Sequence, residues 1–372
     1  MIEFETDAVV VGAGAVGLAC GYALARRGLS VVVLEADRAI GQGVSSRNSE
    51  VVHGGLYYPT GSLRARLCVQ GRRLLYLFLA AHDVAFDRCG KLVVATEDAD
   101  LARLDAIARQ AEVNDVEGMA RLTARQARAL EPELDCLEAL HSPESGVFDS
   151  HGYLAALRAE IEASGGVVAL AAPFMGSSPA AGGGFEVRVG GAEPTTLGAR
   201  LLVTAAGLSA QAVAASIDGF PRASIPPAHL GKGSYFMVQG KAPFARLVYP
   251  TPIPGALGVH YRRDLGGQGR FGPDLEFVDA PDYGVDPARA DSFYAQVRRF
   301  WPGLPDGALA PDYAGVRPKL HGPGEPQPDF RIDDPTVHGL EGLATLFGIE
   351  SPGLTASLAI GEEVAVRLGL GQ

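Results

Sequence analysis

Cysteine is scarce in this chain of 372 residues, which contains only four. Cys20, Cys68, Cys89 and Cys136 lie far apart, and no two of them form a C-x-x-C pair. This spacing argues against a disulfide framework and against the common zinc motifs. We therefore expect reduced thiols, no bound metal and a cytoplasmic location.

The sequence also lacks a long apolar run and a basic leader. Its first residues, MIEFETDAVVVGAG, carry acids where a secretory signal would carry lysine or arginine. No apolar stretch approaches the roughly 18 residues that a membrane-spanning helix needs. The sequence thus predicts no signal peptide and no spanning helix, and it leaves peripheral contact with the inner face of a membrane open.

Positive charge is in deficit, because 32 lysines and arginines face 43 acidic residues and the formal net charge is −11. This balance argues against nucleic acid as the main partner, since phosphate binding needs a positive field. A small anionic substrate stays open, because a few local arginines suffice to bind it.

Hydrophobic residues are plentiful, at 47% of the chain. Apolar runs bounded by glycine predict strands, and longer periodic runs predict helices. The expected strands are 7–11, 30–34, 91–96, 165–170, 185–189, 199–207, 233–238, 246–250, 258–263 and 343–348. The expected helices lie within 12–27, 62–81, 98–110, 123–130, 154–163, 288–300 and 354–368, and Ser62 is a plausible N-cap for the second.

A glycine fingerprint links the first two expected strands, because Gly12, Gly14 and Gly17 have G-x-G-x-x-G spacing. Gly12 permits a tight turn, Gly14 lets the backbone approach a pyrophosphate, and Gly17 lets the helix pack on the strand. The diphosphate would lie at the helix N-terminus, which favours anions. Glu35 ends the second strand, where an acid accepts ribose hydroxyls and would repel the 2′-phosphate of NADP.

Two further turns favour FAD over NAD. Near the C-terminus, SPGLTASLAIGEEVA predicts a turn and then a helix that begins around Gly353–Thr355. The dipole of that helix would stabilise the negative charge of a reduced flavin, and a nicotinamide needs no such partner. Ala206-Gly207 forms another small-residue turn after a strand, and three such turns suit a long cofactor across the carboxyl edge of a sheet. An NAD-dependent dehydrogenase remains the alternative.

Proline and glycine concentrate at 221–227 and at 322–328, which we interpret as crossings between two domains. The predicted fold class is α/β (α+β overall), with a Rossmann-type nucleotide domain and an inserted, mainly antiparallel substrate domain. The nucleotide domain is expected to be discontinuous, over 1–82, 143–220 and 321–372. The substrate domain then comprises 83–142 and 221–320.

The fingerprint, VTAAGLSA and SPGLTASLAIGEEVA together resemble FAD-dependent oxidoreductases of the D-amino-acid-oxidase-like superfamily. Within it, NSEVVHGGLYYPTGSLRARLC and LVYPTPIPGALGVHYRRDLGGQGRFGP resemble L-2-hydroxyglutarate oxidases and dehydrogenases. The chain departs from that pattern at Pro59-Thr60, at Asp274 and at Gly348-Ile349-Glu350.

The resemblance implies bound FAD and oxidation of a small 2-hydroxy acid, L-2-hydroxyglutarate-like, to the 2-oxo acid. It also implies hydride transfer to flavin N5 and reoxidation by oxygen, a quinone or another carrier. Motifs and resemblance together predict FAD contacts from Gly12, Ala13, Gly14, Ala15, Val16, Glu35, Ala36, Ser45, Ser46, Asn48, Ser49, His53, Gly54, Val168, Ala206, Gly207, Gly348, Ile349, Gly353, Leu354 and Thr355.

His53 is the candidate general base, because the pKa of imidazole lies near working pH. It could instead hydrogen-bond the flavin, pack beneath it or carry it covalently, and His260 is the rival base. Arg317 is expected to bind a substrate carboxylate bidentately. Further substrate contacts are expected from Tyr57, Tyr235 and Lys319.

Two smaller expectations concern the neighbourhood of His53. Tyr57 and Tyr58 lie in a strand-like stretch, so that only one of them should face inward. An exposed basic helix face, and no phosphate site, is expected of Arg64, Arg66, Arg72 and Arg73. The same fold also leaves other functions open: an amino-acid or amine oxidase, a glycerol-3-phosphate-type dehydrogenase, or a non-catalytic flavin-binding module.

Overall fold

The computed structural model describes residues 5–252 and 258–371, so residues 253–257 of the expected central motif lie outside the described residues. Its first sheet has eight strands, in the order β10-β11-β12-β1-β2-β9, with β20 beside β12 and β19 beside β20. Five strands run parallel: β1 (Thr6–Val11), β2 (Val31–Leu34), β9 (Val167–Ala169), β12 (Thr195–Thr204) and β20 (Leu343–Phe347). The antiparallel additions are β10 (Phe174–Pro179), β11 (Phe185–Val189) and β19 (Arg331–Asp333). This sheet confirms the α/β part of the prediction.

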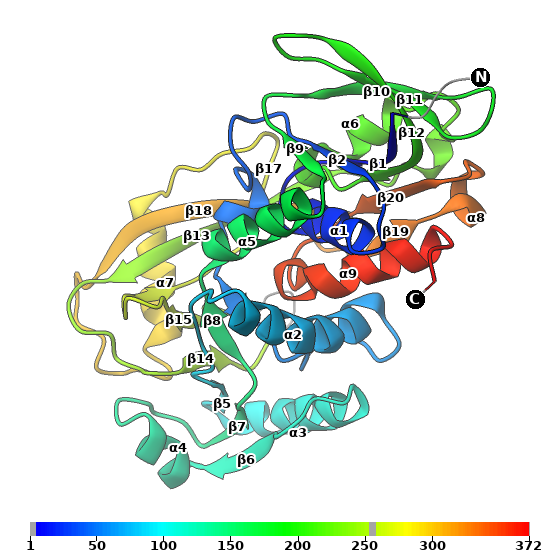
Figure 1. Ribbon diagram of the computed structural model, residues 1–372. Coiled ribbons are helices and arrows are strands. Elements are labelled where there is room, and N and C mark those ends of the chain that lie inside the picture. Colours follow the sequence, from blue (N-terminus) through cyan, green and yellow to red (C-terminus); the bar gives the residue numbers. More distant parts are fainter. Residues whose placement is uncertain (1–4, 253–257, 372) are drawn as a thin grey trace.

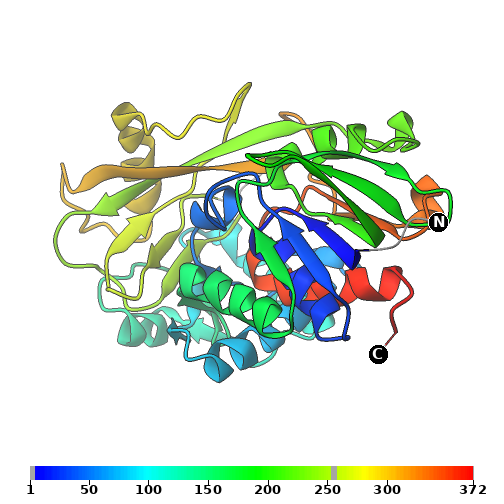
Figure 2. The same cartoon turned by 45° about the horizontal axis from the view of Figure 1, so that its top comes forward.

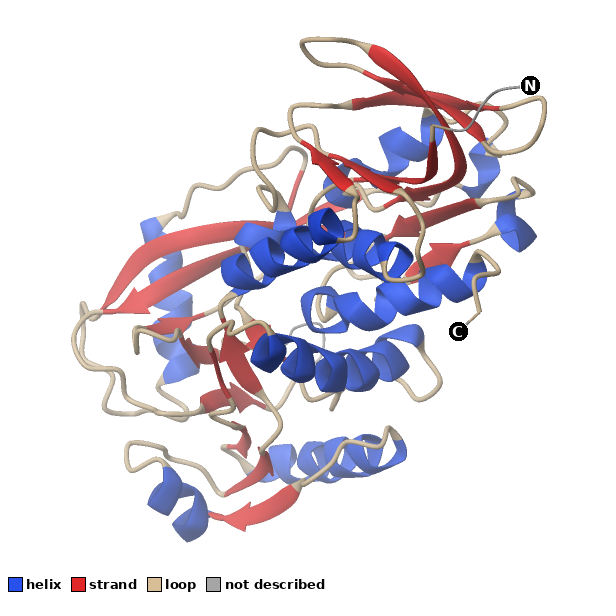
Figure 3. Ribbon diagram, in the orientation of Figure 1, coloured by secondary structure: helices blue, strands red, loops and turns tan. Residues whose placement is uncertain are grey.

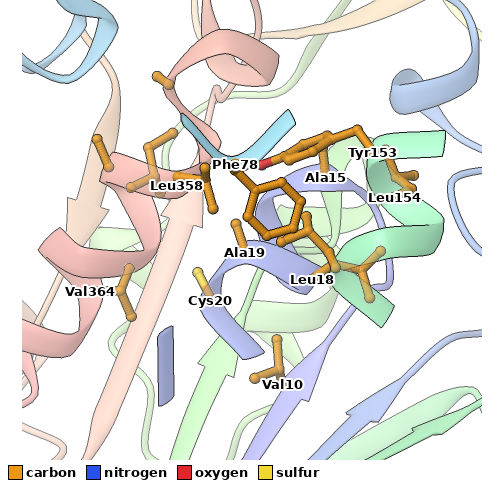
Figure 4. Close-up of a cluster of buried hydrophobic side chains, with 14 of the residues drawn as sticks. Val10, Ala15, Leu18, Ala19, Cys20, Phe78, Tyr153, Leu154, Leu358 and Val364 are labelled. Carbon is orange, nitrogen blue, oxygen red and sulfur yellow. The ribbon is translucent and has the colours of Figure 1, made fainter. Parts of the chain in front are cut away.

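Helices pack tightly against this sheet and against one another (Figure 1). The helices α1 (Ala15–Ala25) and α5 (Ser150–Ala163) contact the sheet, α9 (Gly353–Arg367) packs on α1, and α2 (Leu63–Ala81) packs on α9. Glycines bring them close: a Cβ at Gly361 would lie 2.5 Å from the Ala19 carbonyl oxygen, and a Cβ at Gly71 would lie 2.6 Å from Ala356 Cα. Leu18, Phe78 and Leu358 contribute to the shared core in Figure 4. The packing therefore fixes where α9 begins.

The second sheet has nine strands, in the order β17-β13-β16-β15-β14-β5-β7-β6, with β18 beside β13. Its strands are β5 (Lys91–Ala95), β6 (Ala120–Thr123), β7 (Glu138–Ser142), β13 (His229–Val238), β14 (Leu247–Pro250), β15 (Tyr261–Arg263), β16 (Gly269–Phe271), β17 (Glu276–Val278) and β18 (Leu309–Lys319). Neighbours are antiparallel apart from β5 and β14, which run parallel. Three helices pack against this sheet: α3 (Asp98–Val113), α4 (Ala124–Leu130) and α7 (Ala290–Val297) (Figure 3).

A small third sheet contains β3 (Val51–Val52), β8 (Gly146–Phe148) and β4 (Phe86–Asp87), and β3 ends directly before His53. The remaining short elements are η1 (Val44–Ser46), η2 (Gly207–Ser209), α6 (Ala210–Ala215), η3 (Arg222–Ser224), η4 (Pro287–Arg289) and α8 (Pro335–His338). Residues 221–227 lead from the first sheet to the second, and 322–328 lead back (Figure 2). None of the helices in the described ranges is long and apolar enough to span a bilayer.

Several expected elements differ from the structure. The helix expected over 288–300 consists of η4 and α7 and ends at Val297, and the strand expected over 258–263 begins only at Tyr261. The exposed basic face expected on α2 is wrong for two of its four arginines, because Arg64 is 5% and Arg72 is 1% exposed. That face of the helix packs inward, where acidic residues from distant segments pair with both guanidinium groups.

Candidate active site

Three parallel strands end side by side and create the edge at which the fingerprint lies. Val11 of β1 pairs with Leu34 of β2 on one side and with Thr204 of β12 on the other. Gly12 follows with a φ of 102°, and a Cβ there would lie 2.7 Å from the Ala205 carbonyl oxygen. The turn at Ala206-Gly207 therefore lies beside the fingerprint, and only glycine fits at residue 12.

The N-terminus of α1 has the features of a diphosphate site. Gly14 is its N-cap and, as a glycine, has no side chain to cap the helix. The amide of Ala15, which precedes Val16 in the first turn, donates to Ser45 Oγ at 2.9 Å. The remaining amides of the first turn and the helix dipole at this point favour a bound anion.

A carboxylate is fixed at the end of β2. The two oxygens of Glu35 accept from the amide of Ala13 at 2.8 Å and from the amide of Asp37 at 2.9 Å. Ala36 follows and is exposed, and Val168 lies on the neighbouring strand β9, opposite Val33. This end of the sheet therefore offers an acceptor for ribose hydroxyls beside a strand edge.

The loop from Ser45 to Ser49 bridges the two large sheets. Asn48 Nδ2 donates to the Ser45 carbonyl at 2.7 Å, and Ser46 Oγ donates to the Gly43 carbonyl at 3.1 Å. The Ser49 hydroxyl lies 2.7 Å from the hydroxyl of Tyr235 on β13. The small side chains of Ser46 and Asn48 thus fold the loop on itself, whereas Arg47 between them is exposed.

A cavity of about 470 Å³ adjoins this loop, and its lining includes Asn48, Arg262 and Tyr313. The Tyr313 hydroxyl donates to the Asn48 carbonyl at 2.5 Å and accepts from Arg262 at 2.6 Å. The Tyr313 ring stacks on Tyr235 with 4.5 Å between the ring centroids. These contacts tie β18 and β13 to the loop.

The C-terminal turn brings the start of α9 against residue 53. Gly348 follows β20 with a φ of 64°, and a Cβ at Gly353 would lie 2.7 Å from Ile349 Cγ2. Thr355, which follows Leu354 in the first turn of α9, accepts from the His53 amide at 3.1 Å through its Oγ1. The same hydroxyl donates to the Val51 carbonyl at 3.1 Å. The two ends of the chain therefore meet at one site.

His53 is held at the centre of this site. Its Nε2 lies 3.3 Å from Ser351 Oγ, and its carbonyl accepts from Cys68 Sγ at 3.5 Å. Burial, the nearby charge of Lys91 and His260 together hold the pKa of the His53 imidazole well below its usual range. The ring is thus neutral near pH 7, which is the form that accepts a proton.

An aromatic and cationic cluster, formed by Lys91, Tyr57, Tyr249 and His260, adjoins His53. His260 stacks on Tyr249 with 3.7 Å between the ring centroids and 12° between the planes. The Lys91 ammonium lies 4.1 Å from the centroid of the same Tyr249 ring and 6.0 Å from that of Tyr57. Sequence reasoning missed Lys91 and Tyr249, although a lysine that opens the otherwise apolar strand KLVVA was a usable signal.

Both Tyr57 and Tyr58 face the interior, so the expectation that only one would do so is wrong. The backbone at these residues forms a turn, in which side chains need not alternate. Burial raises the pKa of both phenols. Gly54, next to His53, is closely approached by β7, because a Cβ there would lie 2.8 Å from Ser142 Oγ.

Arg317 is a cation without a carboxylate partner among the described residues. Its Nη2 donates to the Asp274 carbonyl at 2.7 Å, and its Nε donates to the Gly231 carbonyl at 3.3 Å. Gly233 makes room for it, because a Cβ there would lie 2.6 Å from Nη2. The guanidinium is therefore oriented while charge that could bind a carboxylate is retained.

Lys319 lies on the same face of β18 but is already paired. Its ammonium contacts Glu350 at 2.8 Å, and Glu350 also accepts from Gln327 at 2.7 Å and lies 3.4 Å from Arg64. These cations hold the pKa of the Glu350 carboxyl below its usual range in spite of burial. Lys319 is thus better placed to orient the turn before α9 than to bind substrate directly.

Comparison with known proteins gives this geometry its family. The family model described as FAD dependent oxidoreductase matches residues 7–367. The chain belongs to the FAD-dependent oxidoreductase family. Mitochondrial L-2-hydroxyglutarate dehydrogenase of Arabidopsis thaliana is 39% identical over 97% of this chain and 83% of the relative. The enzyme of that name from Caenorhabditis elegans is 33% identical over 72% of this chain and 63% of the relative.

A solved structure of similar fold is dithionite-reduced L-α-glycerophosphate oxidase from Mycoplasma pneumoniae with FAD bound. It has a TM-score of 0.85 at 21% sequence identity, over 98% of this chain and 94% of that one. The predicted FAD cofactor, enzyme class and Rossmann-type fold are confirmed by family and fold together. The individual residue roles in this FAD-dependent oxidoreductase stay predictions.

The close fit around Gly14 allows a test of the predicted diphosphate contact. A Cβ at this residue would lie 3.1 Å from Ser45 Oγ, which the Ala15 amide already uses. Gly14→Val should therefore lose most of its bound FAD, measured as flavin absorbance per protein chain. Gly182→Ala is the matched control because open space surrounds that residue. Full FAD content in Gly14→Val would place the diphosphate elsewhere.

Proposed function

We propose that this enzyme oxidises a 2-hydroxy acid of the L-2-hydroxyglutarate type to the 2-oxo acid. The observation that carries this proposal is the oriented Arg317, which forms no ion pair among the described residues and lies on β18 beside the strand of Tyr235. The chain is 39% identical to an L-2-hydroxyglutarate dehydrogenase. FAD, held by the fingerprint, Glu35 and the loop of Ser45–Ser49, would take up the hydride at N5.

In this proposal His53 accepts the proton of the substrate hydroxyl. A neutral imidazole whose Nε2 is directed to the small Ser351 side chain suits that step, because it can exchange one hydrogen bond for another. His260 stacks on Tyr249 in the cluster beside His53, and it is therefore the alternative candidate for the base.

Arg317 would bind the carboxylate next to the reacting carbon, and its two backbone contacts would keep the guanidinium in one orientation. Tyr57 and Tyr235 would line the pocket. The electrons must then leave to oxygen, a quinone or another carrier, and we propose a cytoplasmic enzyme that could meet a quinone at a membrane surface.

Anaerobic mixing with a panel of substrates tests the proposed function. We expect L-2-hydroxyglutarate to bleach the flavin faster than its D isomer, lactate, glycerol 3-phosphate or any 2-amino acid. Rapid bleaching by an amino acid or by glycerol 3-phosphate, with none by a 2-hydroxy acid, would assign the enzyme to another reaction. Absence of bleaching by every compound would favour a non-catalytic flavoprotein.

A further inference from the structure

Lys91 is a buried cation that the proposed reaction does not use. It lies on β5, between β14 and β7, opposite Leu247 and Ser142. The residue is 0% exposed, and its ammonium has no hydrogen-bond partner and no ion pair among the described residues. Burying an unpaired ammonium is strongly unfavourable, whereas methionine or leucine would fill such a position without that cost.

The Tyr249 ring offsets part of the cost of burying the Lys91 charge. The ammonium lies 4.1 Å from the centroid of Tyr249, within the range of a cation–π contact. Burial lowers the pKa of Lys91 to about 8, with Cys68 and Cys89 acting weakly in the opposite direction. The side chain therefore carries its charge at neutral pH.

No ligand can reach this ammonium directly, because its nitrogen has almost no accessible surface. A role in binding the substrate carboxylate is therefore disfavoured, and any role must act through the electric field. Ser142, which pairs with Lys91 across β5 and β7, lies 2.8 Å from where a Cβ at Gly54 would stand, so the ammonium lies close to the segment that begins with His53. The charge of Lys91 acts on the His53 imidazole. Low dielectric surroundings keep such a field strong.

We infer that Lys91 is a positioning residue whose buried charge, held on the Tyr249 ring, adds to the effect of burial in keeping the His53 imidazole unprotonated and ready to accept a proton. The inference rests on the proposed function of His53. The Tyr249 ring contacts both neighbours of His53, because it stacks on His260 and also lies against the Lys91 ammonium.

Titratable groups approach His53 from several elements. They are Lys91 on β5, His260 before β15, Tyr57 and Tyr58 in their turn, Cys68 on α2 and Glu350 in the turn before α9. The phenols and the thiol stay neutral near pH 7, because burial raises their pKa values. Glu350 is paired with Lys319. Among these described groups, Lys91 is therefore the charged side chain that forms no ion pair.

The test compares Lys91→Met, Lys91→Arg and the wild type in anaerobic flavin reduction by L-2-hydroxyglutarate as a function of pH. In Lys91→Met burial still holds the pKa of His53 below its usual value, so we expect reduction about tenfold slower than wild type only near pH ~5. The difference should be less than about twofold above pH ~8, where Lys91 loses its own charge. Lys91→Arg keeps the charge and should keep the wild-type profile, and exposed Lys241→Met is the control.

A loss that is equal at every pH, or that Lys91→Arg shares with Lys91→Met, would overturn the inference and leave Lys91 a packing residue. The His53 ring titration, followed by NMR in wild type and Lys91→Met, separates this result from failure of the proposed function. A titration unchanged by the substitution overturns the inference whatever the substrate. A titration moved to higher pH, with no 2-hydroxy acid oxidised, supports it and refutes the function alone.

Discussion

Replacing His53 with glutamine is expected to slow flavin reduction by the substrate about 10²–10⁴-fold while FAD stays bound. Glutamine can keep a hydrogen bond to Ser351 but cannot take up a proton at neutral pH. Because the backbone amide of residue 53 makes the contact to Thr355, the substitution leaves that contact in place. Rapid-mixing absorbance of the flavin, with FAD content measured on the same sample, checks the prediction.

The pH dependence sharpens this prediction. The pKa of His53 lies well below the usual 6.5, so the wild-type reduction rate should hold as pH falls through 6.5 and should decline only in more acid solution. His151→Gln, at an exposed residue, is the control and should match wild type. If His53→Gln reduced its flavin at a wild-type rate, the base would have to be sought at His260.

Arg317→Met should lower kcat/KM for the 2-hydroxy acid by about 100-fold, since removing one partner of a buried charged hydrogen bond costs about 3 kcal/mol. Methionine keeps much of the side-chain volume but loses the guanidinium, so both the binding and the alignment of the carboxylate suffer. We expect KM to rise together with a fall in kcat, because orientation is lost as well as affinity. Steady-state kinetics with a dye acceptor would measure both constants.

Two comparisons separate this effect from damage to the fold. Arg158→Met removes an arginine from an i,i+4 pair on the surface of α5 and should leave the kinetics unchanged. Arg317→Lys should recover only part of the loss, because lysine lacks the planar fork that binds a carboxylate through two bonds. Unaltered KM and kcat in Arg317→Met would move the carboxylate site away from β18.

The nucleotide edge was readable from the sequence because its signals are local. Gly12, Gly14 and Gly17 lie within six residues, so their spacing is visible in the sequence although Ala205 and Ser45, which crowd Gly12 and Gly14, come from elsewhere in the chain. Glu35 follows from the same unit, since the distance from fingerprint to acid is set by one helix and one strand. The start of α9 was predictable for a similar reason.

The substrate side could not be read in the same way, because its contacts join distant segments. Arg64 and Glu350 are 286 residues apart, and nothing in the pattern of α2 marks Arg64 as an inward residue. β18 was missed because proline and charged residues interrupt it, although it pairs with β13 from residue 309 to residue 319. Tyr249 reaches Lys91 only because β14 runs parallel to β5, a pairing that strand patterns do not specify.

The hydrogen bond between the His53 amide and the Thr355 hydroxyl joins residues 302 positions apart. A chain emerging from the ribosome would therefore carry its complete glycine fingerprint through the synthesis of about 300 further residues before residue 355 could meet His53. The docking of α9 against α1 and α2, which brings the two segments together, can occur only after the chain has been made through Arg367.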